Sequence, residues 1–223
     1  RSQMNLVAEF AGRADVSGVE RTLRQFEPQD GLPDLRGFEW YYHSQVLRSF
    51  RADWNQGSPV EKLAISNDGR LVASVGSERG INVFDSKKQT LMRTLEIPTG
   101  RVRDLRFSPV TRQMAAGSTD GIVRIWMPHR SDQPQSQFKH GPPVLHVDFS
   151  ADGILLMSAS KKGAVRIWNL ETEELIAEVP TGEGENRDVN LSPDGHLVAV
   201  AKSDGRVRVT EVASLLVRHP SLP

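Results

Sequence analysis

The sequence predicts a mainly β fold of four repeated units, preceded by a short α-helical segment. Two features of the 223 residues carry this prediction. A serine recurs at an interval of 42 residues, at Ser66, Ser108, Ser150 and Ser192. An aromatic residue keeps the same interval, at Phe84, Trp126 and Trp168, with Thr210 in the fourth place. A fixed interval of this length is typical of repeat architectures in which each unit packs against the next.

Each unit shows the alternation of short β-strands. One apolar column holds Leu63, Leu105, Val147 and Val189, and a second, two residues later, holds Ile65, Phe107, Phe149 and Leu191. This spacing places both columns on one face of a strand. An Asp-Gly turn then leads to a second strand of small residues in three units, at Asp68-Gly69, Asp152-Gly153 and Asp194-Gly195. With a third and a fourth strand, four short antiparallel strands in 42 residues predict one blade of a β-propeller.

The repeated units resemble WD repeats. The stretches VRDLRFSPVTRQMAAGSTDGIVRIW and VLHVDFSADGILLMSASKKGAVRIWNL carry the resemblance, which extends over residues 47–217. Pairs near the place of the family's Gly-His are Thr99-Gly100, His140-Gly141 and Thr181-Gly182, so that pair itself is absent. Asp120 and Asp204 keep the family's turn aspartate, whereas Glu78 and Lys162 replace it. We therefore expect no blade to hold the family's full hydrogen-bond network of His, Ser, Asp and Trp.

Residues 1–46 break the interval and show helical spacing. Apolar residues three and four positions apart form two stripes, Met4, Val7 and Phe10, and then Val16, Val19, Leu23 and Phe26. Ser17 and Glu20 have the spacing of a capping box, which predicts the start of a second helix. The aromatic stretch DLRGFEWYY at residues 34–42 predicts a third helix packed on the propeller, with an exposed peptide-binding surface as the alternative. This lead-in resembles that of bacterial WD-repeat proteins, some of which are fused to serine/threonine protein kinases.

The predicted organisation has two domains. The helical lead-in covers residues 1–46, and the propeller region covers residues 47–223. Within the latter we expect a lone strand at 47–57, blades at 58–99, 100–141 and 142–183, and a degenerate fourth blade at 184–223 that ends in a strand at Leu215–Arg218. Four blades are fewer than the seven usual in the family, so we expect an open or partial propeller. Truncation of a longer chain is the favoured explanation; a dimer and a ring closed by the lone strand are the alternatives.

Composition excludes several classes of function. The chain has 28 Lys and Arg against 28 Asp and Glu, and this balance argues against binding to nucleic acid or an anionic membrane. It has no cysteine, which excludes disulfides and thiolate metal sites but does not fix the compartment. We see no apolar run long enough for a membrane span and expect no membrane insertion of this segment. No cofactor is predicted.

Catalytic motifs are fragmentary. Asp104-Leu105 and Asp148-Phe149 each match part of a kinase signature, but the accompanying residues are missing and both pairs fall in predicted strands. The histidines show no metal-ligand spacing; they are His43, His129, His140, His146, His196 and His219. The column Arg124, Arg166 and Arg208 is interpreted as a solvated strand face. We therefore predict neither catalytic nor metal-binding residues.

The resemblance implies an interaction surface instead. In WD-repeat proteins the loops before the first strand of each blade and between its second and third strands contact protein or peptide partners. On this sequence, those positions are Arg79, Arg101, Thr119, Lys161, Lys162, Glu183, Arg187 and Ser203. The leading hypothesis is a non-catalytic scaffold for protein–protein interaction. The alternatives are a sensory or substrate-recruiting region of a bacterial receptor kinase and, more remotely, a propeller enzyme. Open blade edges would also allow self-association.

Overall fold

The computed structural model describes residues 16–25, 54–77 and 80–212. The chain divides into two compact units, Arg1–Asn55 and Gln56–Pro223. Of the predicted elements, the other lead-in helices, the aromatic stretch, most of the lone strand and the strand at Leu215–Arg218 lie outside these residues.

The first unit contains one described helix, α2, at Val16–Arg24. Its Leu23 side chain is buried, as the apolar stripe predicts. Its last turn holds Arg21 and Arg24, whose charges suit the negative end of the helix dipole. The helix begins before Ser17, so the predicted N-cap at that residue is wrong. Asp15 precedes the helix in the sequence, and aspartate is as good a capping residue type as serine.

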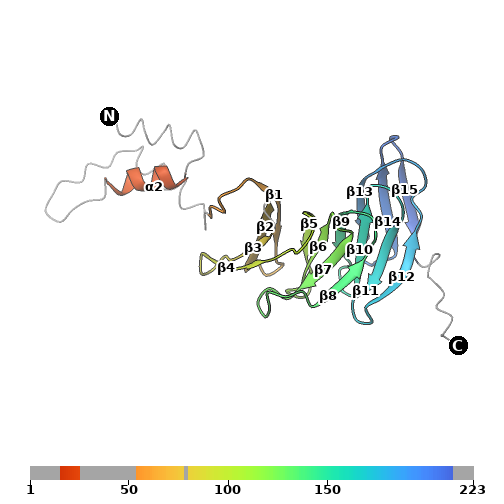
Figure 1. Cartoon of the computed structure of the whole chain (residues 1–223), viewed down its shortest axis with the longest axis horizontal. Coiled ribbons are helices and arrows are strands. Elements are labelled where there is room, and N and C mark those ends of the chain that lie inside the picture. Colours follow the sequence, from red (N-terminus) through yellow and green to blue (C-terminus); the bar gives the residue numbers. More distant parts are fainter. Residues whose placement is uncertain (1–15, 26–53, 78–79, 213–223) are drawn as a thin grey trace. The chain divides into compact units, whose positions relative to one another are not determined.

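The second unit consists of four antiparallel sheets, which follow one another in chain order (Figure 1). Blade 1 contains β1 (Val60–Ile65), β2 (Leu71–Gly76), β3 (Ile81–Asp85) and β4 (Thr90–Leu95). Blade 2 contains β5 (Val102–Phe107), β6 (Met114–Ser118), β7 (Ile122–Trp126) and β8 (Ser136–Lys139). Blade 3 contains β9 (Val144–Phe149), β10 (Leu155–Ser160), β11 (Val165–Asn169) and β12 (Glu174–Val179). Blade 4 contains β13 (Asn186–Leu191), β14 (Leu197–Lys202) and β15 (Val207–Glu211). The predicted mainly β, blade-like architecture is confirmed.

The recurring serine holds the first turn of each blade. In blade 1 the Ser66 hydroxyl donates to Asp68 Oδ1 at 2.7 Å and accepts the Leu71 amide at 2.9 Å. Gly69 completes this turn with a φ of 64°, a value that glycine adopts at little cost. The same contacts recur at Ser150 and Ser192. The 42-residue interval therefore reports a turn that is stabilised by a side chain.

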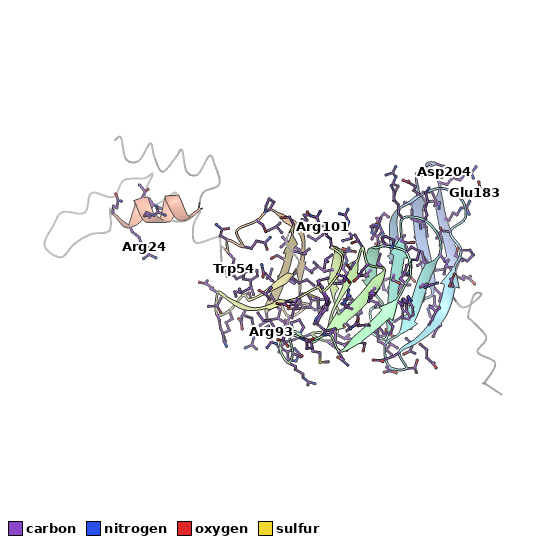
Figure 2. All side chains as sticks on the ribbon, in the orientation of Figure 1. Arg24, Trp54, Arg93, Arg101, Glu183 and Asp204 are labelled. Carbon is purple, nitrogen blue, oxygen red and sulfur yellow. The ribbon has the colours of Figure 1, made fainter. Side chains whose placement is uncertain are left out.

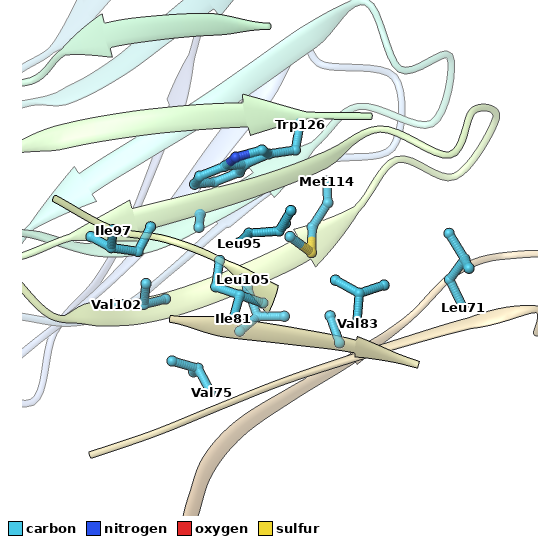
Figure 3. Close-up of a cluster of buried hydrophobic side chains, with 12 residues drawn as sticks. Leu71, Val75, Ile81, Val83, Leu95, Ile97, Val102, Leu105, Met114 and Trp126 are labelled. Atoms are coloured by element: carbon cyan, nitrogen blue, oxygen red, sulfur yellow. The ribbon is translucent and has the colours of Figure 1, made fainter. Parts of the chain in front are cut away.

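Each pair of neighbouring blades shares an apolar core. Figure 3 shows the first such core, in which Ile81, Val83 and Leu95 of blade 1 pack with Leu105 and Met114 of blade 2. We call the sheet face that packs on the following blade the forward face, and the opposite one the rear face. The junction between blades 2 and 3 is so close that a Cβ on Gly117 would lie 2.5 Å from Val144 Cγ1. Small residues in the second strands permit this approach.

Buried carboxylates join the first strands of successive blades. Asp104 Oδ2 accepts the Val147 amide of the next blade at 3.1 Å, and Asp148 Oδ2 accepts the Leu191 amide at 3.4 Å. First strands lie at the free edge of each sheet, where amides lack a strand partner. Both kinase-like fragments are therefore parts of the blade-to-blade packing.

The hydrogen-bond network around the conserved-interval tryptophans differs between blades. In blade 3, Ser158 Oγ accepts Trp168 Nε1 at 2.8 Å and lies 2.9 Å from His140 Nδ1. With Lys162 in the aspartate position, this network has three of the four expected members. In blade 2, Ala116 occupies the serine position, and the buried Trp126 Nε1 has no hydrogen-bond partner. Blade 2 thus leaves unsatisfied a donor that blade 3 satisfies.

Substitution of Ala116 by Ser should supply the missing acceptor to Trp126. We expect Ala116→Ser to raise the free energy of unfolding by about 1 kcal/mol, the usual net value of one hydrogen bond. The matched control is Ala115→Ser, because Ala115 is equally buried but faces the apolar core shared with blade 3. That change should lower the free energy of unfolding by about 1–3 kcal/mol. Urea denaturation followed by tryptophan fluorescence measures both; equal effects of the two variants would contradict the assignment.

Candidate partner-binding surface

One end of the strands carries most of the residues that the sequence singled out. We define the loop surface as Thr99, Arg101, Thr119, Asp120, Lys161, Lys162, Glu183, Glu185, Arg187, Ser203 and Asp204, together with Glu61. They belong to the loops before β5 and β13 and to the turns that join the second and third strands of blades 2, 3 and 4. Figure 2 shows Arg101, Glu183 and Asp204 along the same side of the blades. Arg79 lies outside the described residues.

Reciprocal hydrogen bonds fix the backbone of this surface. Arg101 N donates to Thr119 Oγ1 at 2.9 Å, and Thr119 N donates to Arg101 O at 2.9 Å. Two blades later, Glu185 N donates to Ser203 Oγ at 3.1 Å, and Ser203 N donates to Glu185 O at 2.9 Å. The structure thus joins two pairs of loops, of which the sequence predicted Arg101, Thr119 and Ser203 but missed Glu185.

Ion pairs hold several exposed side chains of the loop surface. Arg101 lies 2.9 Å from Glu61, and Lys161 lies 3.1 Å from Glu185. Arg187 approaches the same Glu185 at 3.7 Å. The hydrogen bond from Lys161, with the charges of Lys161, Arg187 and Lys162, lowers the pKa of Glu185. Each such exposed pair contributes less than about 1 kcal/mol to stability, so partner binding can replace it at small cost.

Asp120 joins the surface to the interior of blade 2. Its Oδ2 accepts Arg124 Nη2 at 2.7 Å and Thr99 Oγ1 at 2.8 Å. Burial favours the protonated acid, but the hydrogen bonds from Arg124, Thr99 and the Ile122 amide outweigh it and lower the pKa of Asp120. Arg124 is 4% exposed, so the interpretation of its column as a solvated face is wrong at this position. The reason is this buried aspartate, which lies one turn away and satisfies the guanidinium.

The rest of the arginine column is divided between structure and solvent. Arg166 Nη1 donates to the carbonyls of His140 at 2.7 Å and Lys139 at 3.2 Å, and its Nε lies 3.3 Å from Glu178 Oε2. Arg166 therefore holds the chain where it passes from blade 2 to blade 3. Arg208 is exposed, as predicted.

A buried lysine supports the loop before β13. Lys202 is 4% exposed, and its Nζ donates to Gly184 O at 2.9 Å and to Asn186 Oδ1 at 3.0 Å. Gly182 O and Thr181 Oγ1 lie at 3.4 and 3.5 Å. The corresponding positions of the other blades hold Gly76, Ser118 and Ser160, so repeat periodicity gave no signal for this residue.

Removal of the Lys202 ammonium should loosen the loop from Thr181 to Glu185. We expect Lys202→Met to lower the free energy of unfolding by about 1–3 kcal/mol, because buried oxygens lose their donor. Lys161→Met is the control: it removes a solvent-exposed ion pair and should cost less than about 1 kcal/mol. Chemical denaturation measures both, and limited proteolysis should cut the loop faster only in Lys202→Met. Equal stability of the two variants would show that the ammonium does not support the loop.

The histidines of the described region have local roles. Burial, together with the Arg166 charge, lowers the pKa of His140 to about 4. His146 and His196 lie 3.6 Å from Asp188 and Asp194 respectively. His43 and His219 are outside the described residues. Within the described ranges, no three His, Asp or Glu side chains are arranged to hold a metal ion. No helix in that part of the chain is long and apolar enough to cross a membrane.

The low pKa of His140 makes stability depend on pH. Between about 4 and the ordinary value of about 6.5, the unfolded chain binds a proton that the folded chain does not, so stability falls as pH falls through this window. Blade 1 holds Gln56 at the same repeat position, where its Oε1 accepts the Ser74 hydroxyl at 2.6 Å. His140→Gln should therefore fold with a stability within about 1 kcal/mol of the parent at pH 7. Between pH 7 and pH 5 it should lose less stability than the parent in urea titrations; parallel losses would refute this assignment.

Comparisons with known proteins identify the repeats. The family model described as WD domain, G-beta repeat matches residues 89–127 and 132–169, which are therefore WD40 repeats. The chain is 29% identical over 163 residues to the WD repeat-containing protein SL1-17 of Schistosoma mansoni, covering 73% of this chain and 54% of that protein. It is 26% identical over 193 residues to the SIR4-interacting protein SIF2 of Saccharomyces cerevisiae, covering 79% and 35%.

A third relative is the target of rapamycin complex subunit LST8 of Mus musculus, 25% identical over 173 residues and covering 76% of this chain and 52% of that protein. The matched region thus spans about a third to a half of the length of these relatives. The comparisons show neither a bacterial origin nor fusion to a kinase for this chain.

Proposed function

We propose that this chain is a non-catalytic scaffold that binds other proteins or peptides through the loop surface. The observation that carries the proposal is the reciprocal bonding of two loop pairs, Arg101 with Thr119 and Glu185 with Ser203. This bonding fixes the backbone, while the charged side chains of the surface stay exposed. A rigid backbone that presents exposed side chains loses little entropy on binding.

The names of the relatives support an interaction role. One is named for its interaction with another protein, and another is named as a subunit of a complex. Each relative is much longer than the matched region, so the identity of any partner of this chain is not transferred from them.

The chemistry of the described residues favours binding over catalysis. Asp104 and Asp148, the most enzyme-like carboxylates of the sequence, accept backbone amides of the following blades. His140 is neutral and hydrogen-bonded inside blade 3. These groups are engaged in packing, so a substrate would have to displace structural hydrogen bonds to reach them.

The charges of the loop surface favour a partner with mixed polarity. Lys161, Lys162 and Arg187 surround the single carboxylate of Glu185. Lys162 is exposed and forms no ion pair with a described residue. This part of the surface therefore offers a local positive charge on a chain whose formal net charge is zero. We propose that it contacts acidic side chains of a protein or peptide, and that nucleic acid is not a partner.

Charge reversal on the loop surface tests this proposal. The triple variant Arg101→Glu, Lys162→Glu and Arg187→Glu should lose at least tenfold in affinity for proteins that the parent retains from extracts of its native cells. The matched control is Lys87→Glu, Lys88→Glu and Arg130→Glu, which reverses three exposed charges in turns at the opposite end of the strands.

Both triple variants should keep the circular dichroism spectrum of the parent. Quantitative mass spectrometry of the retained proteins, followed by titration with the purified partner, gives the affinities. Equal loss in both variants, or no loss in the loop-surface variant, would place the interaction elsewhere.

A further inference from the structure

Exposed large apolar side chains of the described region concentrate on two sheet faces. There are eight such residues in that region, and four lie in blade 1, at Val60, Leu63, Ile65 and Leu91. Three lie in blade 4, at Leu197, Val207 and Val209. Only Val110 lies in neither blade. These seven residues belong to the rear face of blade 1 and the forward face of blade 4, the two faces at the ends of the series in Figure 1.

The rear face of blade 1 repeats faces that are buried elsewhere. Leu63 is 61% exposed, whereas its equivalents Leu105, Val147 and Val189 are 0 to 3% exposed. The equivalents of Val60 in blades 2 and 3, Val102 and Val144, are buried in the junction cores. Leu175, the equivalent of Leu91, packs against the junction between blades 2 and 3. The rear face of blade 1 is therefore one half of a blade junction.

The forward face of blade 4 supplies the other half. Val207 is 71% exposed, whereas its equivalents Ile81, Val123 and Val165 are completely buried. Val209 is 62% exposed, and its equivalents Val83, Ile125 and Ile167 are at most 1% exposed. Ala199 and Ala201 are small residues on the same face, as Ala115 and Gly117 are on the forward face of blade 2. A following blade could therefore approach as closely as blade 3 approaches blade 2.

Polar groups at the rims of the two end faces are also complementary. Asp68 in the first turn of blade 1 pairs with Arg112 in the first turn of blade 2 at 2.7 Å. The residue of blade 4 equivalent to Asp68 is Asp194, and the residue of blade 1 equivalent to Arg112 is Arg70. Asp188 likewise occupies the repeat position of Asp104, whose carboxylate accepts an amide of the next blade. Opposite charges thus wait at matching positions of the two ends.

We propose that the forward face of blade 4 binds the rear face of blade 1 in a second copy of this chain. The contact reproduces the three internal junctions, with Val207 and Val209 of one copy packed on Leu63 and Ile65 of the other. Asp194 then pairs with Arg70 across the interface. The sequence analysis expected self-association through open strand edges, whereas the exposed side chains point to the sheet faces as the contact. Because the two faces differ, the assembly is head-to-tail.

Two double variants test this arrangement. Leu63→Lys with Ile65→Lys disables the rear face of blade 1, and Val207→Lys with Val209→Lys disables the forward face of blade 4. In light scattering coupled to size-exclusion chromatography, the parent chain should show masses of at least twice 24.8 kDa that increase with concentration. Each double variant alone should have the mass of one copy. An equimolar mixture of the two should form a dimer, since each variant supplies the face that the other lacks.

A matched control adds the same two charges away from both faces. Val110→Lys with Thr172→Lys places them on exposed turn positions of blades 2 and 3 and should assemble as the parent does. A charge exchange gives a second test: Asp194→Arg should weaken assembly at least tenfold, and Arg70→Asp in the same chain should restore it.

Three outcomes would overturn the proposal. A parent chain that stays a single copy up to 100 times the concentration used for detection would show that no second copy binds. Assembly of both double variants would assign the contact to strand edges. A mixture that remains monomeric, or one double variant that still dimerises, would exclude the head-to-tail arrangement.

Discussion

The structure depends on the burial of one apolar sheet face against the next. A single four-stranded sheet has two apolar faces and cannot bury both by itself. At each of the three internal junctions, residues of two blades form a shared core, such as the one around Leu105 and Trp126. The interval of 42 residues keeps the matching columns in register from one blade to the next. Turn geometry, the loops and the state of the end faces all follow from this packing.

Packing of the blades also determines how polar groups are used. Carboxylates that resemble catalytic groups in the sequence are occupied by backbone amides of the adjoining blade, as at Asp104. Loops at one end of the strands are joined in pairs, so their side chains are presented from a fixed backbone. Lys202 provides a further fixed point beneath the loop that leads into β13. The same interactions that join the sheets therefore create a surface suited to binding.

The sequence predicted the repeated architecture well because periodicity reports packing directly. The serine column marks a turn closed by side-chain hydrogen bonds, and the apolar columns mark the junction cores. Periodicity failed where one blade differs from its neighbours. Arg124 was expected in solvent but is buried beside Asp120, and Lys202 has no equivalent in the other blades. The fourth strand of blade 2, Ser136–Lys139, was also missed, since its polar residues alternate with the single buried Phe138.

The central claim is that the two end faces are open halves of a blade junction and that a second copy covers them. Amide hydrogen exchange at low and high protein concentration tests it most directly. Exchange in β1 and β15 should slow as the concentration rises, while β6, β7 and β9–β11 exchange equally slowly at both concentrations. Exchange that is independent of concentration in β1 and β15 would contradict the claim.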